Sequence, residues 1–167
     1  MSDNQAGMFS LEGKTAIVTG ANTGLGQAFA IGLARAGAKV ACVGRSGMDE
    51  TLALIDDADN SLAIKADLGS LEPIDRIVSE VLDWSGRIDI LVNNAGIIRR
   101  ADALEFSEAD WDAVMDVNLK SLFFLSQAVA RTMVPRGSGK IINIASLLSF
   151  QGGIRIPSYT ASKSGVA

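Results

Sequence analysis

The chain of 167 residues is 48% hydrophobic and 20% charged, which is typical of one globular domain with a sizeable core. Its net charge of -4 and its lack of a basic block argue against a nucleic-acid partner. With no histidine and one cysteine, we expect no metal site and no internal disulfide, and Cys42 is predicted to be a buried small hydrophobe. The single cysteine and the composition favour a reducing compartment, so we expect a cytoplasmic protein. The N-terminus has neither a basic n-region nor an apolar h-region, and the chain has no apolar run of about 18 residues, so we expect no signal peptide and no membrane span.

Apolar runs alternate with amphipathic stretches along residues 10–167, which we predict to form a single domain after a flexible tail at residues 1–9. The apolar runs predict buried strands at residues 14–19, 39–43, 61–66, 88–92 and 140–145. The amphipathic stretches predict helices at residues 25–36, 71–84, 107–133 and from 158 onward. Gly37 is expected to end the first helix, and Ser107 to cap the third with Asp110 at the capping-box position.

This alternation predicts the α/β fold class, with a doubly wound parallel sheet between two helical layers. Ligands of such sheets bind beyond the carboxyl ends of the strands. Nearly all of the polar and glycine-rich motifs in the chain follow directly after predicted strands. We therefore expect them to gather at one edge of the sheet.

The first motif is the glycine-rich segment TGANTGLG, which runs from Thr19 to Gly26 between the first strand and the first helix. Its spacing is GxxxGxG. Gly20 permits a tight turn, Gly24 the close approach of a phosphate, and Gly26 close packing of the helix, whose N-terminus faces the anion. The motif predicts a dinucleotide site, although an ordinary glycine-rich loop between strand and helix has the same composition.

Two asparagine motifs follow. The segment NNAG, from Asn93 to Gly96, comes directly after the fourth strand, where asparagine side chains can fix backbone groups and a glycine leaves room for a ligand. A simple turn fits NNAG equally well. Asn118 lies among apolar residues of the predicted third helix, which indicates a buried polar role, either structural or functional.

The only tyrosine of the chain, Tyr159, precedes Lys163 by four residues, so both side chains lie on the same helix face. A nearby ammonium stabilises a phenolate, which allows a tyrosine to exchange a proton with an alcohol or a carbonyl oxygen. In a chain without histidine, this pair is the candidate acid and base. Ser146 follows the fifth strand at the same edge. Taken alone, a tyrosine and lysine at this spacing are also typical of a surface helix.

Together these motifs resemble the short-chain dehydrogenase/reductase family, in order and spacing from Phe9 to the end: TGANTGLG, Asp67-Leu68, NNAG, Asn118, Ser146 and YTASK at 159–163. The segments LVNNAGIIRRADALEFSEADWD and GKIINIASLLSFQGGIRIPSYTASKSGV resemble more particularly the 2-deoxy-D-gluconate 3-dehydrogenase group. That group is also described as 2-dehydro-3-deoxy-D-gluconate 5-dehydrogenase, of pectin and uronate breakdown. The resemblance implies a Rossmann-like, three-layer αβα domain that binds a dinucleotide and carries the catalytic residues.

The resemblance also implies residue roles. Tyr159 is the expected acid/base, and Lys163 stabilises its phenolate and holds the nicotinamide ribose. Ser146 hydrogen-bonds the reacting oxygen, and Asn118 holds a water that relays protons toward Lys163. Asp67 is expected to contact the adenine. The full set of residues expected to bind the cofactor is Gly20, Asn22, Thr23, Gly24, Leu25, Gly26, Arg45, Ser46, Asp67, Leu68, Asn94, Ala95, Gly96, Tyr159 and Lys163.

The choice between NAD and NADP stays open. NAD-preferring members often carry an acidic residue at the end of the second strand, where this chain has Gly44. Arg45 and Ser46 can instead receive a 2′-phosphate, which favours NADP, whereas the resembled group is mostly associated with NAD.

The expected reaction is hydride transfer between a nicotinamide cofactor and a secondary alcohol or ketone of a deoxy sugar acid. We expect Arg100 or Arg155, and less so Arg99, to bind the substrate carboxylate, because arginine suits bidentate recognition; solvated surface charge is the other reading of each. Ser146 and Tyr159 complete the expected substrate site. The alternatives are a 3-oxoacyl carrier-protein reductase, a polyol dehydrogenase, or a nucleotide-binding regulatory protein without catalysis.

The resemblance further implies a homotetramer that uses the long helix around Phe123 and Phe124. Members of the family continue well beyond the catalytic helix, with further strands and a substrate-covering loop. We therefore expect the sequence, which ends at Ala167, to be truncated after that helix begins, so that the C-terminal part of the family domain is absent. The fifth strand is then expected to lie at an uncovered edge of the sheet.

Overall fold

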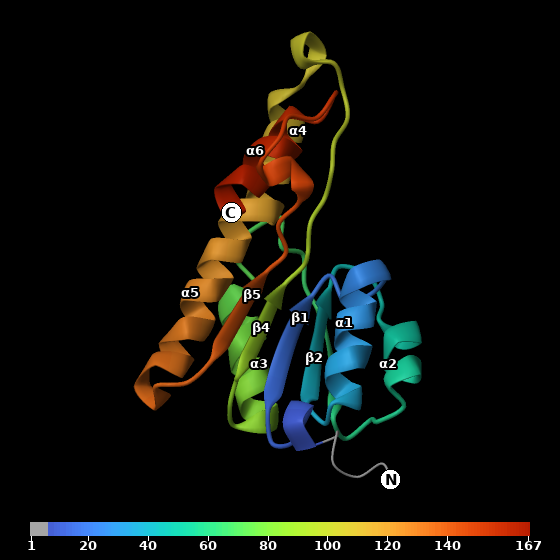
Figure 1. The fold of residues 1–167 in the computed structure, drawn as a ribbon, viewed down its shortest axis with the longest axis vertical. Helices are drawn as coiled ribbons and strands as arrows, with labels where there is room; N and C mark the ends of the chain where they lie inside the picture. The colour runs from blue at the N-terminus through green and yellow to red at the C-terminus, as the bar shows by residue number, and fades with distance from the viewer. Residues whose placement is uncertain (1–6) are drawn as a thin grey trace.

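The computed structural model describes residues 7–167, so residues 1–6 of the predicted tail lie outside the described residues. The fold is built on a five-stranded parallel sheet with the strand order β3-β2-β1-β4-β5 (Figure 1). The strands are β1 (Thr15–Thr19), β2 (Lys39–Gly44), β3 (Ser61–Lys65), β4 (Ile90–Asn93) and β5 (Lys140–Asn143). All five predicted strands are confirmed, with ends that differ by at most two residues.

The helices are α1 (Gly24–Arg35), α2 (Asp49–Ile55), α3 (Ile74–Ser85), α4 (Glu108–Met115), α5 (Ser121–Met133) and α6 (Pro157–Val166). A π-helical turn, η3 (Asp116–Lys120), joins α4 to α5. The remaining short turns are η1 (Gly7–Phe9), η2 (Ala103–Glu105), η4 (Val134–Arg136) and η5 (Leu147–Ser149). Among residues 7–167, no helix combines the length and apolar character needed to cross a membrane.

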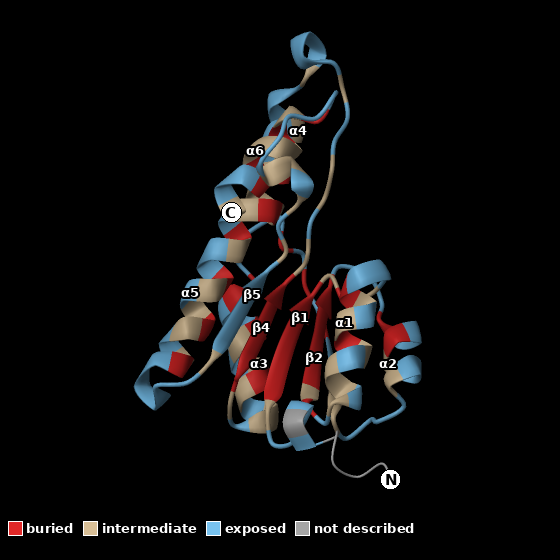
Figure 2. Cartoon of the chain, in the orientation of Figure 1, coloured by how far each residue is buried: buried red, intermediate tan, exposed pale blue. Residues whose placement is uncertain are grey.

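Helices cover both faces of the sheet, as predicted. Successive side chains of a strand point to opposite faces, so Ile17 and Leu91 pack with α3 and α5, whereas Val18 and Val92 pack with α1 and α2. Cys42 belongs to the second cluster, is fully buried and is free, which confirms its predicted role as a small hydrophobe. Strands β1 and β4 are buried along their whole length, and β2 is buried in all but its first residue (Figure 2).

Strand β5, at one edge of the sheet, differs from the other strands because all four of its residues are exposed (Figure 2). Its Ile141 and Ile142 are 38% and 46% exposed, respectively. The expected uncovered edge is therefore present in the structure.

Two helix predictions are corrected by the structure. Helix α2 was not predicted, because its seven residues are too few to give a clear helical period. The predicted helix at 107–133 is interrupted by the π-helical turn, which adds a residue to the helical turn without breaking the pattern of the sequence. Ser107 does cap α4, since its hydroxyl accepts from the Asp110 backbone N–H at 3.1 Å. The Asp110 carboxylate, however, accepts from the Ser107 hydroxyl at 3.0 Å, so the capping box is incomplete.

The strand order reverses direction between β1 and β4, the position at which doubly wound sheets bind ligands. The loops after these two strands meet there. Helices α4 and α6 lie beyond the carboxyl ends of β4 and β5 in Figure 1, at the same edge. This arrangement brings the predicted motifs to one end of the molecule.

Candidate functional site

The glycine-rich loop leads from β1 into the N-terminus of α1. Gly20 and Gly24 both have positive φ, 66° and 58°, which favours glycine. A Cβ on Gly26 would lie 2.1 Å from the Gly20 carbonyl oxygen, so the helix can approach the turn only because residue 26 has no side chain. A Cβ on Gly24, in contrast, would meet nothing within 4 Å.

The first turn of α1 has donors to offer. Thr23 is its N-cap, but the Thr23 side chain makes no capping hydrogen bond. The first backbone N–H groups of a helix have no partner within it, and the helix dipole favours an anion at this end. The turn therefore suits a phosphate group.

Helix α2 supports this loop from behind, although the sequence did not indicate it. The buried Thr51 hydroxyl donates to the Ala21 carbonyl oxygen at 2.8 Å and accepts from the Gln27 amide at 3.1 Å. The Ala21 N–H donates in turn to the Val43 carbonyl oxygen at 3.2 Å. The loop backbone is thus held by hydrogen bonds to β2 and α2. Sequence reasoning missed Thr51 because it did not predict the short helix after β2.

Thr19 and Asn94 join the two strand ends at the reversal point. The Thr19 hydroxyl accepts from the backbone N–H groups of Asn94 and Ala95, both at 3.0 Å, and donates to the Val92 carbonyl oxygen at 3.3 Å. The Asn94 side-chain amide donates to the Thr19 carbonyl oxygen at 3.0 Å. Asn94 therefore fixes backbone groups at the strand end, as predicted, whereas the role of the Thr19 hydroxyl was not foreseen.

The end of β2 carries the residues expected to select the cofactor. Arg45 and Ser46 are both exposed, and the Ser46 hydroxyl accepts from the Asn22 side-chain amide at 2.9 Å. A Cβ on Gly44 would lie 3.2 Å from the Asn22 carbonyl oxygen Oδ1. These four residues form a small polar corner next to the glycine-rich loop, with one positive charge and no acidic residue.

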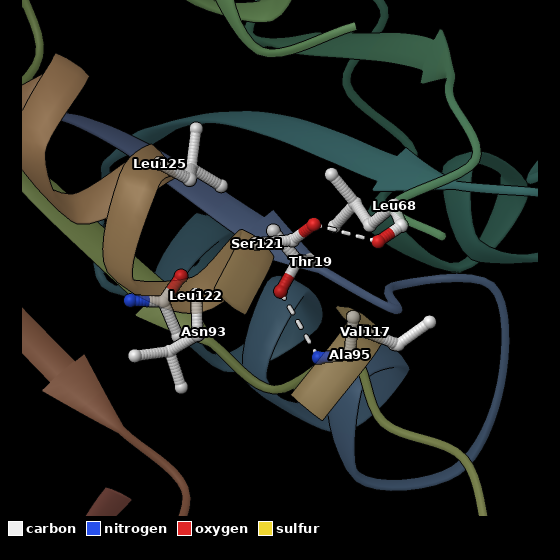
Figure 3. Close-up of a pocket in the computed structure, with 8 residues that line it drawn as sticks. All are labelled: Thr19, Leu68, Asn93, Ala95, Val117, Ser121, Leu122 and Leu125. Atoms are coloured by element: carbon white, nitrogen blue, oxygen red, sulfur yellow. Dashed lines mark hydrogen bonds between the residues drawn. The ribbon is translucent and has the colours of Figure 1, made fainter. Parts of the chain in front are cut away.

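Asp67 and Leu68 follow β3, the neighbour of β2 in the sheet. The exposed Asp67 carboxylate accepts from the Gly69 N–H at 2.9 Å, and the Leu68 carbonyl oxygen accepts from the buried Ser121 hydroxyl at 2.7 Å. A small pocket lies between this loop, the ends of β1 and β4 and the start of α5 (Figure 3). Of the residues described, Ser146, Tyr159 and Lys163 do not line it, so it is separate from the predicted reaction centre.

Asn118 lies in the π-helical turn and is fully buried. Its carbonyl oxygen Oδ1 accepts from the Ile97 N–H at 2.8 Å, and its amide donates to the Ile97 carbonyl oxygen at 3.0 Å and to the Ser162 hydroxyl at 3.1 Å. Single π-helical turns occur often at functional sites. The turn thus links the segment after NNAG to the helix that carries Tyr159.

Lys163 lies in α6 and is only 4% exposed. Its ammonium donates to the Ile144 carbonyl oxygen at 2.6 Å and lies 5.9 Å from the centre of the Tyr159 ring. Burial lowers the pKa of the Lys163 ammonium, because desolvation disfavours the charged form. Tyr159 is half-buried one helical turn away, so the structure brings the predicted pair together.

Ser146 caps the short turn η5, where its hydroxyl accepts from the Leu148 N–H at 3.2 Å. Its own N–H donates to the Ser149 hydroxyl at 3.2 Å, which donates to the Lys163 carbonyl oxygen at 2.6 Å. Ser149 therefore ties the Ser146 turn to α6. No sequence pattern indicated this role of Ser149.

The three candidate substrate arginines are all exposed. Arg99 pairs with Asp110 at 3.1 Å, and the Nε of Arg155 pairs with Asp102 at 3.0 Å. Arg155 also adopts a positive φ of 63°, in the left-handed region that non-glycine residues seldom enter. Within residues 7–167, Arg100 forms no ion pair, so its guanidinium is the least committed of the three.

A glycine-rich loop, asparagines at the reversal point and a buried lysine next to a tyrosine are thus combined on one parallel sheet. The family model described as short chain dehydrogenase matches residues 14–167. The chain belongs to the short-chain dehydrogenase family. Its fold is accordingly the Rossmann-like α/β fold that the sequence predicts.

Members of the short-chain dehydrogenase family with similar sequences include two proteins named 2-dehydro-3-deoxy-D-gluconate 5-dehydrogenase. The chain is 56% identical to the one from Escherichia coli (strain K12) over 160 residues and 50% identical to the one from Bacillus subtilis (strain 168) over 161 residues. Each match covers 95% of this chain and 63% of the relative. The chain thus spans somewhat less than two thirds of the length of these curated relatives.

Solved structures of the family agree with the fold. A structure from Agrobacterium tumefaciens, described as a 2-deoxy-D-gluconate 3-dehydrogenase with bound NADP, superposes with a TM-score of 0.83 at 59% identity and covers 94% of this chain and 63% of that chain. A structure from Beutenbergia cavernae, described as an NAD(P)-dependent gluconate 5-dehydrogenase with NADP bound at low occupancy, gives a TM-score of 0.87 at 48% identity, with coverages of 95% and 64%.

Proposed function

We propose that the protein transfers a hydride between a nicotinamide cofactor and a secondary alcohol or ketone of a deoxy sugar acid of the gluconate type, with Tyr159 as the acid/base. The observation that carries this proposal is the buried Lys163 ammonium beside Tyr159, at the edge of the sheet where the dinucleotide loop also lies. A surface helix pair would leave the lysine in water. Burying this ammonium lowers its pKa and disfavours its charged form. A role for the ammonium in stabilising the Tyr159 phenolate explains why the protein bears this desolvation cost.

The residues at the carboxyl ends of the strands suit a dinucleotide. The open space above Gly24 and the uncapped first turn of α1 leave room and donors for the pyrophosphate. Asn94 and Ala95 are held against Thr19 at the end of β1, where we expect them to border the cofactor, and we expect Asp67 to contact the adenine. When it is bound, the nicotinamide supplies the hydride chemistry, and the protein residues position the reactants and move the proton.

The proton steps fall to the residues around α6. In oxidation, the Tyr159 phenolate takes the proton of the substrate hydroxyl; in reduction, the Tyr159 phenol returns it to the forming alkoxide. The Lys163 ammonium stabilises the phenolate and is aimed by the Ile144 carbonyl oxygen. The Ser146 hydroxyl donates to the reacting oxygen. We further propose that Asn118 holds a water that relays protons toward Lys163.

The substrate class rests on the relatives, whose names specify gluconate-type substrates. Such a substrate carries a carboxylate, which an arginine can bind with two parallel hydrogen bonds. We propose Arg100 as the main carboxylate partner, because Arg99 and Arg155 are already paired with Asp110 and Asp102. Arg155 remains a second candidate, since only its Nε is used in the ion pair.

We further propose NADP as the preferred cofactor. The corner formed by Asn22, Gly44, Arg45 and Ser46 offers a cation and polar groups to a 2′-phosphate, and the two similar structures from Agrobacterium tumefaciens and Beutenbergia cavernae hold NADP.

We also propose that the whole protein is a homotetramer in the cytoplasm. The exposed side chains of Phe123 and Phe124 on α5 support an interface between subunits at this helix.

A second candidate is a 3-oxoacyl carrier-protein reductase, favoured by a 37% identical relative of that name from Synechocystis. Turnover assays with NAD and with NADP distinguish the two candidates. They use a panel of gluconate-type sugar acids, neutral polyols and 3-oxoacyl thioesters. We expect the absorbance of reduced nicotinamide to change when a sugar acid is the substrate, and to stay constant with the polyols and the thioesters. Turnover of the thioester but of no sugar acid would contradict the proposed substrate class.

The proposed role of Arg100 is tested in the same assay. Arg100→Ala is expected to raise KM for the sugar acid by about 10- to 100-fold, the equivalent of one charge-assisted interaction. The exposed Arg131 on α5 provides the control, and Arg131→Ala is expected to leave KM unchanged. An unchanged KM in a variant with alanine at residues 99, 100 and 155 would refute a carboxylate site made by these arginines.

A further inference from the structure

Ser162 lies in α6 directly before Lys163 and is fully buried. Its hydroxyl has two partners. It accepts from the Asn118 amide at 3.1 Å and donates to the Tyr159 carbonyl oxygen at 2.8 Å. A single side chain thus connects the π-helical turn to the backbone of the tyrosine.

The Asn118 amide depends on this contact. One of its N–H groups donates to the Ile97 carbonyl oxygen and the other reaches Ser162, while Oδ1 accepts from the Ile97 N–H. Since Asn118 is fully buried, bulk water cannot replace a lost partner. Removal of the Ser162 hydroxyl therefore leaves an N–H without a partner between η3 and α6.

Close packing on the same side makes the position of α6 sensitive to this contact. A Cβ on Gly165 would lie 2.9 Å from a methyl group of Leu119 in the π-helical turn, so α6 and η3 approach closely. Ser162 and Gly165 are three residues apart, slightly less than one turn of α6. Together they set how α6 is rotated about its axis, and this rotation aims Tyr159 and Lys163.

From these contacts we infer that Ser162 is a positioning residue, which transmits the placement of Asn118 to the Tyr159 and Lys163 pair. The inference rests on the proposed function for its kinetic consequence, but the geometry that it describes is independent of turnover. In the proposed mechanism, Ser162 contacts neither the reacting atoms nor the cofactor.

Ser158 provides a matched control. It lies in the same helix, is also fully buried, and has the same side chain, but its hydroxyl has no hydrogen-bond partner within the described chain. Ser158→Ala removes a buried hydroxyl without removing a hydrogen bond. Any effect that Ser162→Ala shows beyond Ser158→Ala therefore comes from the link between Asn118 and Tyr159.

Two measurements test the inference. In turnover assays of the active protein, Ser162→Ala is expected to lower kcat by about 10- to 100-fold, as small misplacements of reacting groups do, while KM stays near the wild-type value. Ser162→Thr, which keeps the hydroxyl, is expected to recover most of the loss. A kcat loss that is the same for Ser158→Ala, or no loss for Ser162→Ala, would overturn the inference.

The second measurement needs no activity. Tyr159 is the only tyrosine, so a protein labelled with [13Cζ]tyrosine gives one NMR signal that reports on this ring alone. We expect the signal to shift or broaden in Ser162→Ala and to stay at the wild-type position in Ser158→Ala. If both variants keep the wild-type signal, the inference fails. If the wild-type protein has no dehydrogenase activity but the signals differ as expected, the proposed function fails and the positioning role stands.

Discussion

The Lys163 ammonium donates to the carbonyl oxygen of Ile144 at 2.6 Å, which joins α6 to the residue that follows β5. The Ile144 N–H donates in turn to the Asn93 carbonyl oxygen at 3.0 Å. The ammonium is thus held by the sheet edge as well as by its own helix. The position of Lys163 beside Tyr159 is therefore fixed by long-range contacts, which cannot be inferred from the spacing of four residues between the two.

Lys163 makes stability depend on pH in the alkaline range. Burial lowers the pKa of its ammonium in the folded protein below the ordinary value of about 10.4 expected after unfolding. Below both values the folded protein bears the full cost of burying the charge. As the pH rises through the lowered folded-state pKa, the folded protein loses this proton first and the cost disappears.

Chemical unfolding of wild type and Lys163→Met at several pH values checks this. The free energy of unfolding of the wild type, relative to that of Lys163→Met, is expected to rise with pH between the lowered pKa and about 10.4. Lys140→Met, at an exposed position, is the surface control. A relative stability that falls with pH in this interval would contradict a buried, desolvated ammonium.

The strands and the positions of the motifs could be predicted from the sequence, because buried parallel strands are short, continuous apolar runs and their loops carry glycine and asparagine. The contacts that hold the site residues in place could not be predicted from the sequence. Thr51 lies on a helix too short to leave a period, and the π-helical turn around Asn118 preserves the apolar pattern of an ordinary helix. Ser149 and Ser162 act through contacts between distant segments, and a serine has no sequence context that marks such a role.

The glycine-rich loop gives a prediction about close packing. Gly26→Ala would place a Cβ 2.1 Å from the Gly20 carbonyl oxygen, which is backbone and cannot move aside easily. We expect a loss of about 1–3 kcal/mol in the free energy of unfolding, as overpacking commonly costs, together with weaker cofactor binding because the loop must shift.

Gly32 is the matched control in the same helix, since a Cβ at residue 32 would meet nothing within 4 Å. Gly32→Ala is expected to stabilise the protein by about 0.5–1 kcal/mol, the usual gain from alanine in a helix interior. Thermal or chemical unfolding of both variants is the measurement. Equal effects of the same sign at both positions would contradict the close approach of α1 to the turn after β1.

Arg45 gives a prediction about cofactor choice. If its guanidinium binds a 2′-phosphate, Arg45→Ala should raise KM for NADP by about 10- to 100-fold, the value of one charge-assisted hydrogen bond, and leave KM for NAD unchanged. Arg35→Ala, at the exposed end of α1, controls for the loss of a surface charge. A wild-type protein that strongly prefers NAD would contradict the role assigned to Arg45.

The central claim is that Tyr159 is the acid/base beside a bound nicotinamide, and Tyr159→Phe tests it most directly, because only the phenolic oxygen is removed. Turnover and binding of reduced cofactor, followed by its fluorescence, are measured on the same preparation. We expect kcat to fall by about 10²- to 10⁴-fold, the range attributed to general acid–base catalysis, with cofactor affinity close to that of the wild type. A variant that turns over as fast as the wild type would contradict the account.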